Sequence, residues 1–195
     1  PNQSVPYTKI KPLVNKRLQS WPEGTWLEVS SKGPHTKIGR VSWSWSGLHI
    51  GIILPENLAL RTLSNDATHT LDDWFQPGSV YLMINPSGTR PLVYGKNDRC
   101  IVLGRSPSGQ LSAQAKYLLP ATLVKSSESM PEWLQFEQLG SQLLITLAPD
   151  TPGMESFKKH RTLGFNLLFI GKNREIVSWT PLTHRYSWDT PSIWG

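Results

Sequence analysis

The sequence predicts an all-β protein, a single antiparallel β-sandwich of immunoglobulin-like or jelly-roll-like form with about nine or ten strands. Two observations favour this class. Short runs in which apolar and polar residues alternate recur along the chain and are bounded by Gly, Pro, Asn and Ser. No stretch carries the longer pattern of an amphipathic helix. The 195 residues, of which 38% are hydrophobic, are enough for one domain with a sizeable core.

The first residues differ from the rest of the chain. Residues 1–13 are polar and contain three prolines, and they show no basic-then-apolar leader pattern. We expect a tail or an edge strand there, followed by the sandwich domain over residues 14–195. The β pattern begins at Thr25, where Trp26 opens the first alternating run.

A β-hairpin is predicted around Gly47. Residues 41–46 alternate strictly between two faces, and residues 48–53 repeat the alternation. Two such runs joined by a Ser-Gly pair are typical of a hairpin. Trp43 and Trp45 fall on one face of the first run, so we expect both to pack in the core or on a half-exposed sheet face.

Residues 55–78 are punctuated by Pro, Asn, Asp and Gly and are expected to form a long loop, which in a compact domain is often functional. A short helical turn is expected over residues 154–159 and a loop over residues 180–195. The run from Leu163 to Ile170 is apolar on both faces, as in a central strand. The remaining predicted strands are Ser79–Asn85, Arg99–Gly104, Glu132–Glu137, Gln142–Leu147 and Glu175–Trp179.

No catalytic motif or metal-binding spacing stands out. The only adjacent acidic pair, Asp72-Asp73, lies in the predicted loop. Aspartate favours turns, so we expect the pair to form a turn rather than to bind calcium. The five histidines show no metal-binding spacing. The single cysteine, Cys100, lies in an apolar stretch and is expected to be a buried thiol. We therefore expect a non-catalytic binding domain without a cofactor, with calcium as the alternative.

The net charge of +6 permits an anionic partner without selecting one. No apolar run approaches the roughly 18 residues of a membrane span. No nucleic-acid recognition motif is present. We expect neither a membrane span nor a nucleic-acid partner.

Two of the nine tryptophans lie where no core partner is evident from the sequence. Trp74 sits in the polar loop, and Trp179 ends a strand before a loop that contains proline. An exposed aromatic ring can stack on the apolar face of a pyranose. The alternative for both tryptophans is that they anchor their loops.

Five segments, taken in order over about residues 14–195, resemble carbohydrate-binding module family 9 and the related DOMON-like sandwiches. They are Leu18–Pro22, Gly39–Ile52, Asp73–Asn85, Leu163–Asn166 and Ser187–Gly195. In the sugar-binding members of this family two tryptophans hold a terminal sugar between them. The resemblance implies the same role for Trp74 and Trp179.

The resemblance also implies polar partners around the sugar. Tyr81 falls near a family glutamate, and Gly78 replaces an aspartate nearby, so two acceptors for sugar hydroxyls are missing. Arg99 and Arg105 are alternative candidates for the basic partner. Family members carry structural calcium, whose ligands are not identifiable here.

The function expected from these features is binding of a polysaccharide or oligosaccharide by a monomeric domain of a larger exported protein, located outside the cell, in the periplasm or on the cell surface. The positive charge favours an acidic glycan. One alternative is a structural or protein-interaction sandwich that has lost sugar binding. Another is a haem-binding DOMON-like domain with Met83 and His184 as ligands, although a sheet role and a loop role are expected for these two residues.

Overall fold

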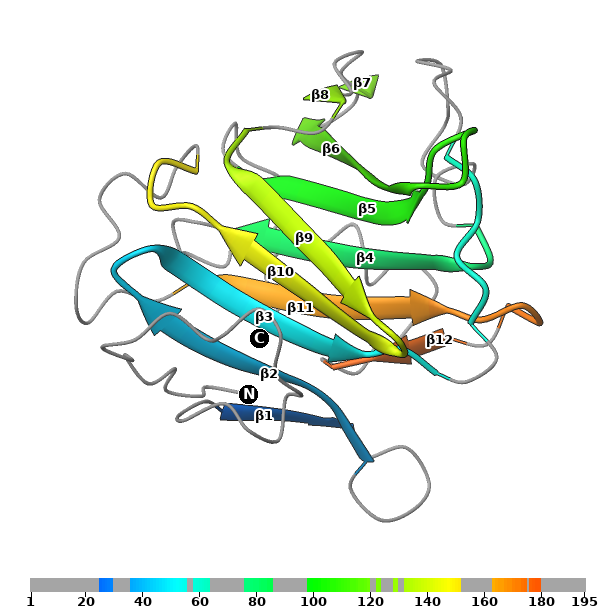
Figure 1. Cartoon of the computed structure of the whole chain (residues 1–195). Helices are drawn as coiled ribbons and strands as arrows, with labels where there is room; N and C mark the ends of the chain where they lie inside the picture. The colour runs from blue at the N-terminus through cyan, green and yellow to red at the C-terminus, as the bar shows by residue number, and fades with distance from the viewer. Residues whose placement is uncertain are drawn as a thin grey trace. The chain divides into compact units, whose positions relative to one another are not determined.

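A computed structural model describes ten segments of the chain, and its described part is β throughout, without a helix (Figure 1). The described segments are residues 25–29, 36–55, 58–63, 76–85, 98–119, 122–123, 128–129, 132–151, 163–174 and 176–179. The chain divides into two compact units. Unit 1 comprises residues 1–56 and 132–151, and unit 2 comprises residues 57–131 and 152–195. Each unit carries one antiparallel sheet.

The sheet of unit 1 has the strand order β1-β2-β3-β10-β9 (Figure 1). Its strands are β1 (Thr25–Val29), β2 (Thr36–Ser44), β3 (Gly47–Ile53), β9 (Leu134–Leu139) and β10 (Gln142–Leu147). The predicted hairpin is confirmed, because β2 and β3 pair directly with Ser44 opposite Gly47. The predicted strand over residues 142–147 matches β10 to the residue.

The alternation in β2, β3 and β10 places a buried apolar cluster on one face of the unit 1 sheet. Ile50 lies opposite Val41 on one side and opposite Ile145 on the other. All three side chains are buried, as are Leu48 and Ile52 in β3 and Leu143 and Leu147 in β10. The other face carries a row of polar residues across four strands, formed by Ser42, His49, Thr146 and Gln135.

The sheet of unit 2 has the strand order β12-β11-β4-β5-β6-β7, and β8 pairs with β6. Its strands are β4 (Ser79–Asn85), β5 (Arg99–Arg105), β6 (Leu111–Leu119), β7 (Thr122–Leu123), β8 (Glu128–Ser129), β11 (Gly164–Ile170) and β12 (Ile176–Ser178). β4 matches the predicted strand to the residue. The described part holds twelve strands rather than nine or ten, because β6 and the two-residue strands β7 and β8 were not predicted.

The central strands of the unit 2 sheet, β4, β5 and β11, are buried on both faces. The register places Val80, Leu82 and Phe169 on one face, which also carries Trp179 and is called the Trp179 face below. Tyr81 and Met83 lie on the opposite face, called the Tyr81 face. Met83 is buried in β4, as expected for a sheet residue.

Cys100 also lies on the Tyr81 face, opposite Met83 on one side and Lys116 on the other. Its thiol is completely buried, which confirms the expectation from its apolar surroundings.

The long predicted loop is partly docked on the unit 2 sheet. In its described part, the Arg61 amide donates to the Gly78 carbonyl at 2.7 Å, and the Leu63 amide donates to the Arg105 carbonyl at 2.7 Å. Thr62 forms a parallel bridge with Arg105. Leu63 is buried, so this segment belongs to the core of the unit rather than to a free loop.

Several expectations fall outside the described residues. They concern the tail over residues 1–13, the Asp72-Asp73 pair, Trp74, the helical turn over residues 154–159 and the loop over residues 180–195 with His184. The division into a tail and one sandwich domain therefore stays a prediction. Among the described residues, no helix has the length and apolarity that a membrane crossing requires.

Candidate functional site

Trp179 directly follows β12 and is held on the unit 2 sheet. Its amide donates to the Leu167 carbonyl at 2.9 Å. Its ring packs against Phe165 with 5.3 Å between the ring centroids and 49° between the planes. Only 8% of the residue is exposed. Trp179 therefore offers a ligand little more than an edge of its indole in this structure, and its stacking role stays a prediction.

Tyr81 holds the chain that leads into β4. The Gln76 amide donates to the Tyr81 hydroxyl at 2.9 Å, and that hydroxyl lies 3.4 Å from the Gln76 carbonyl oxygen. Burial raises the pKa of the Tyr81 phenol to about 12. The Tyr81 side chain lies on the opposite face of the sheet from Trp179. Tyr81 is thus placed to fix the backbone two residues after Trp74, rather than to join Trp179 around a ligand.

The structure separates the two candidate arginines. The register runs from Phe165 through Ile84 to Arg99, so Arg99 lies on the Trp179 face at the end of the sheet where Phe165 lies. Two strand spacings put the backbones of Phe165 and Arg99 about 10 Å apart. Arg105 lies at the far end of β5, where its Nη1 donates to the Gly109 carbonyl at 2.9 Å and closes the turn before β6. Arg99 is therefore the better candidate for a polar partner of Trp179.

Arg99 belongs to a buried polar group at the start of β5. Its Nη1 donates to the Asp98 carbonyl at 3.0 Å. The Asp98 carboxylate accepts a hydrogen bond from Asn85 Nδ2 at 2.8 Å. All three side chains are buried, and burial of charged groups requires such partners. The group places an arginine and a carboxylate where β4 ends and β5 begins.

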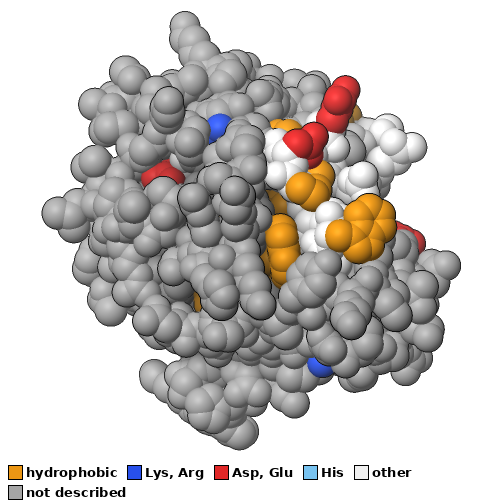
Figure 2. All heavy atoms as spheres, turned by 90° about the vertical axis from the view of Figure 1, so that its left-hand side faces the viewer, with side chains coloured by type: hydrophobic (Ala, Val, Ile, Leu, Met, Phe, Trp, Pro, Cys, Tyr) orange, Lys and Arg blue, Asp and Glu red, His pale blue; other side chains and the backbone are white. Residues whose placement is uncertain are grey.

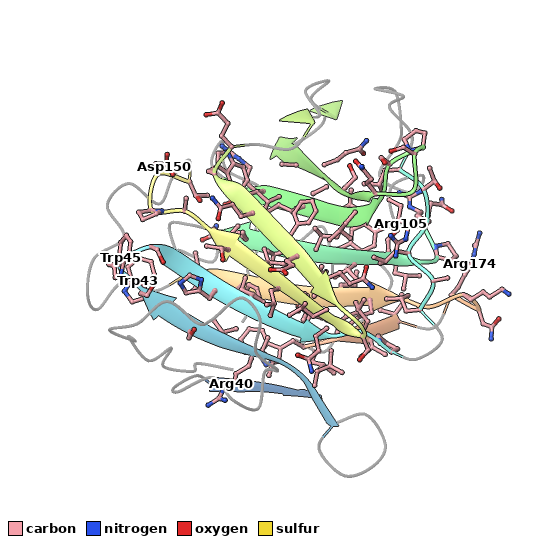
Figure 3. The ribbon with its side chains drawn as sticks, in the orientation of Figure 1. Arg40, Trp43, Trp45, Arg105, Asp150 and Arg174 are labelled. Atoms are coloured by element: carbon pink, nitrogen blue, oxygen red, sulfur yellow. The ribbon has the colours of Figure 1, made fainter. Side chains whose placement is uncertain are left out.

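Trp45 corrects an expectation from the sequence. β2 ends at Ser44, so Trp45 lies in the turn and not on the strand face that carries Trp43. Trp45 is 71% exposed, whereas Trp43 is half-buried. The alternation of polar residues and tryptophans continues through Trp45, so the sequence predicted a strand where the turn begins. Figure 2 shows exposed hydrophobic side chains beside acidic ones on this side of the molecule, and Figure 3 labels Trp43 and Trp45 there.

A buried polar cluster supports the turn that carries Trp45. Ser44 Oγ lies 2.7 Å from His49 Nε2 and 2.9 Å from Ser46 Oγ. His49 Nδ1 lies 3.1 Å from Thr146 Oγ1. A hydroxyl beside an imidazole can serve as nucleophile and base. Here Ser44 is fully buried, which keeps it from a substrate, and the cluster instead ties β2, the turn, β3 and β10 together.

The described residues contain no group of three or more His, Cys, Asp or Glu side chains placed to hold a metal ion. Neither a protein-family model nor a curated protein matches the chain.

Solved structures do match the chain, and they show that it has the fold of carbohydrate-binding modules of family 9. One is a family 9 module from Caldicellulosiruptor kristjanssonii in complex with cellotriose, with a TM-score of 0.52 and 12% identity, covering 98% of this chain and 90% of that chain. A family 9 module from the same organism in complex with glucose gives a TM-score of 0.51 and 11% identity, covering 98% and 92%.

Together with the two antiparallel sheets, this likeness confirms the predicted class, an all-β antiparallel sandwich. It also confirms that the chain resembles family 9 in its fold.

Proposed function

We propose that this protein is a non-catalytic carbohydrate-binding module whose ligand is a chain of glucose units. The observation that carries the proposal is the fold, which is shared over 98% of the chain with a module that holds cellotriose. A second module of this fold holds glucose. A fold hosts many functions, so the proposal depends on the site residues as well.

The proposed site comprises Trp74 and Trp179, with Arg99 as the polar partner. Support for it comes from unit 2, where Arg99 lies on the Trp179 face. An arginine has five N–H donors, which suit the hydroxyl oxygens of a sugar. The Tyr81 hydroxyl, bonded to Gln76, steadies the backbone that follows Trp74. We further propose that the module belongs to a larger exported protein.

One observation favours an alternative. Trp179 is 8% exposed, so a ligand reaches its ring face only if neighbouring groups move. Together with the missing acceptors at Gly78 and Tyr81, this burial supports a structural or protein-interaction domain of the same fold.

Calorimetric titration of the whole chain with glucose, cellotriose and an acidic oligosaccharide separates the two functions. We expect saturable binding of cellotriose that Trp74→Ala weakens about 10-fold or more, as expected for a central aromatic contact. Trp133→Phe is the matched control, because Trp133 is a buried tryptophan of unit 1. Circular dichroism checks that each variant is folded. If the folded protein binds no sugar, the alternative function holds.

A further inference from the structure

The end of the unit 1 sheet that carries the β2–β3 turn presents an aromatic ring to solvent. Trp45 is the most exposed large hydrophobic residue of the described chain, at 71%. The segment Ala148–Thr151 that follows β10 lies at the same end, because Gly47 approaches the Leu147 carbonyl and Ala148. Figure 3 shows Asp150 at this end with Trp43 and Trp45. We call this end the hairpin end.

The turn that presents Trp45 is held in place from several sides. Gly47 has a φ of 127°, and a Cβ there would collide with the Leu147 carbonyl oxygen, so the turn lies directly against β10. The Ser46 amide donates to Ser44 Oγ at 3.2 Å, which links the turn to the buried cluster around His49. A ring on a fixed turn loses little conformational freedom when a ligand stacks on it.

Among the described residues, the charged side chains at the hairpin end are acidic. Asp150 and Glu132 are both exposed. Glu132 lies at this end because the carbonyl of the next residue, Trp133, accepts a hydrogen bond from the Ala148 amide at 2.9 Å. Carboxylates accept hydrogen bonds from sugar hydroxyls and repel anions. This end therefore suits a neutral sugar rather than an acidic one, although the whole chain carries a net charge of +6.

We propose that Trp45 is a second stacking platform, which binds a pyranose ring of a neutral glucan chain at the hairpin end of unit 1. The inference rests on the proposed function for the class of ligand, but it uses residues outside the site with Trp74 and Trp179. An indole can cover the apolar face of a sugar ring, and carboxylates at the same end of the sheet can accept hydrogen bonds from the sugar hydroxyls. Such a platform adds affinity for a polymer without being needed for a short oligosaccharide.

The test compares a polymer with a trisaccharide, using the full chain. Affinity electrophoresis in hydroxyethyl cellulose measures binding to a neutral glucan, and calorimetry measures binding of cellotriose. Trp45→Ala is expected to weaken polymer binding about 2- to 12-fold, the range for an aromatic stacking contact, with cellotriose affinity unchanged. Ile176→Ala is the matched control, since Ile176 is the other exposed large hydrophobic residue of the described chain, at 46%, and it should change neither value.

A direct readout follows the ring itself. Hydroxyethyl cellulose should protect the wild-type protein from acrylamide quenching of tryptophan fluorescence, and the protected fraction should fall in Trp45→Ala. Carboxymethyl cellulose at low salt should protect Trp45 less than the neutral polymer.

The outcomes separate the two proposals. Polymer binding that is unaltered in folded Trp45→Ala, or stronger protection of Trp45 by the acidic polymer, overturns the platform and leaves the proposed function standing. Trp45-dependent polymer binding without any cellotriose binding supports the platform and overturns the site with Trp74 and Trp179. A folded protein that binds neither ligand overturns both.

Discussion

At the scale of single residues, the structure gives the candidate site residues different places on the unit 2 sheet, which the sequence alone could not do. The resemblance to family 9 pointed to Trp179, Tyr81 and two arginines without ordering them in space. Pairing of the strands then placed Tyr81 on the opposite face from Trp179. It put Arg99 at the end of β5 that lies toward Phe165, and Arg105 at the other end of β5. Burial of Trp179 arises from its contact with Phe165, fourteen positions earlier in the chain, and no local pattern encodes such a contact.

Tyr81 gives a prediction at this scale. Burial raises its pKa from 10.0 to about 12, so folding favours the neutral phenol. Its contribution to stability is full below pH 10 and is lost as the pH rises toward 12. Absorbance titration at 295 nm should show a tyrosine with a pKa near 12 that is absent in Tyr81→Phe. If both proteins give the same titration curve, the phenol is not buried as described.

At the scale of elements, strands with strong alternation or β-branched residues were predictable, and others were not. β4 and β10 match their predictions to the residue. β6 contains Ala and Lys, which are depleted in strands, and the sequence did not predict it. The buried Ala113 and Ala115 face the larger Leu103 and Ile101 across the ladder, so neighbouring strands rather than intrinsic propensity explain this strand.

The β2–β3 turn gives a prediction at the scale of elements. Gly47→Ala adds a Cβ at a φ of 127° where it meets the Leu147 carbonyl. Backbone strain and the collision together should lower the free energy of unfolding by about 2–5 kcal/mol, measured by urea denaturation. Gly109→Ala is the control: Gly109 has a φ of 82° with nothing within 4 Å of its added Cβ, so only strain remains. Equal losses in the two variants would contradict the close packing of the turn on β10.

At the scale of the whole molecule, the fold class followed from the pattern of short alternating runs. The same fold occurs at 12% identity in the family 9 module with cellotriose, because apolar positions of suitable size determine such a core more than particular residues do. The ligand was harder to infer. The net charge of +6 favoured an acidic glycan, whereas the described hairpin end carries carboxylates. Total charge does not reveal where charges lie.

Salt dependence tests this distinction for the whole molecule. Raising NaCl from about 0.1 to about 1 M shortens the Debye length from about 10 to about 3 Å and should leave the affinity for cellotriose within about two-fold, because the ligand is uncharged. Calorimetry at both concentrations measures it. An acidic oligosaccharide that binds more tightly than cellotriose at low salt and loses that advantage at high salt would return the ligand to the acidic class.

The buried thiol of Cys100 has a practical consequence. It is the only cysteine in the chain, and it is completely enclosed in β5. A maleimide reagent therefore reaches it only when this part of unit 2 opens, so the rate of labelling under native conditions reports the free energy of that opening. For the same reason, a cysteine introduced at the exposed Lys172 would be the only readily labelled thiol of the folded protein, and it would accept a single dye at a known position.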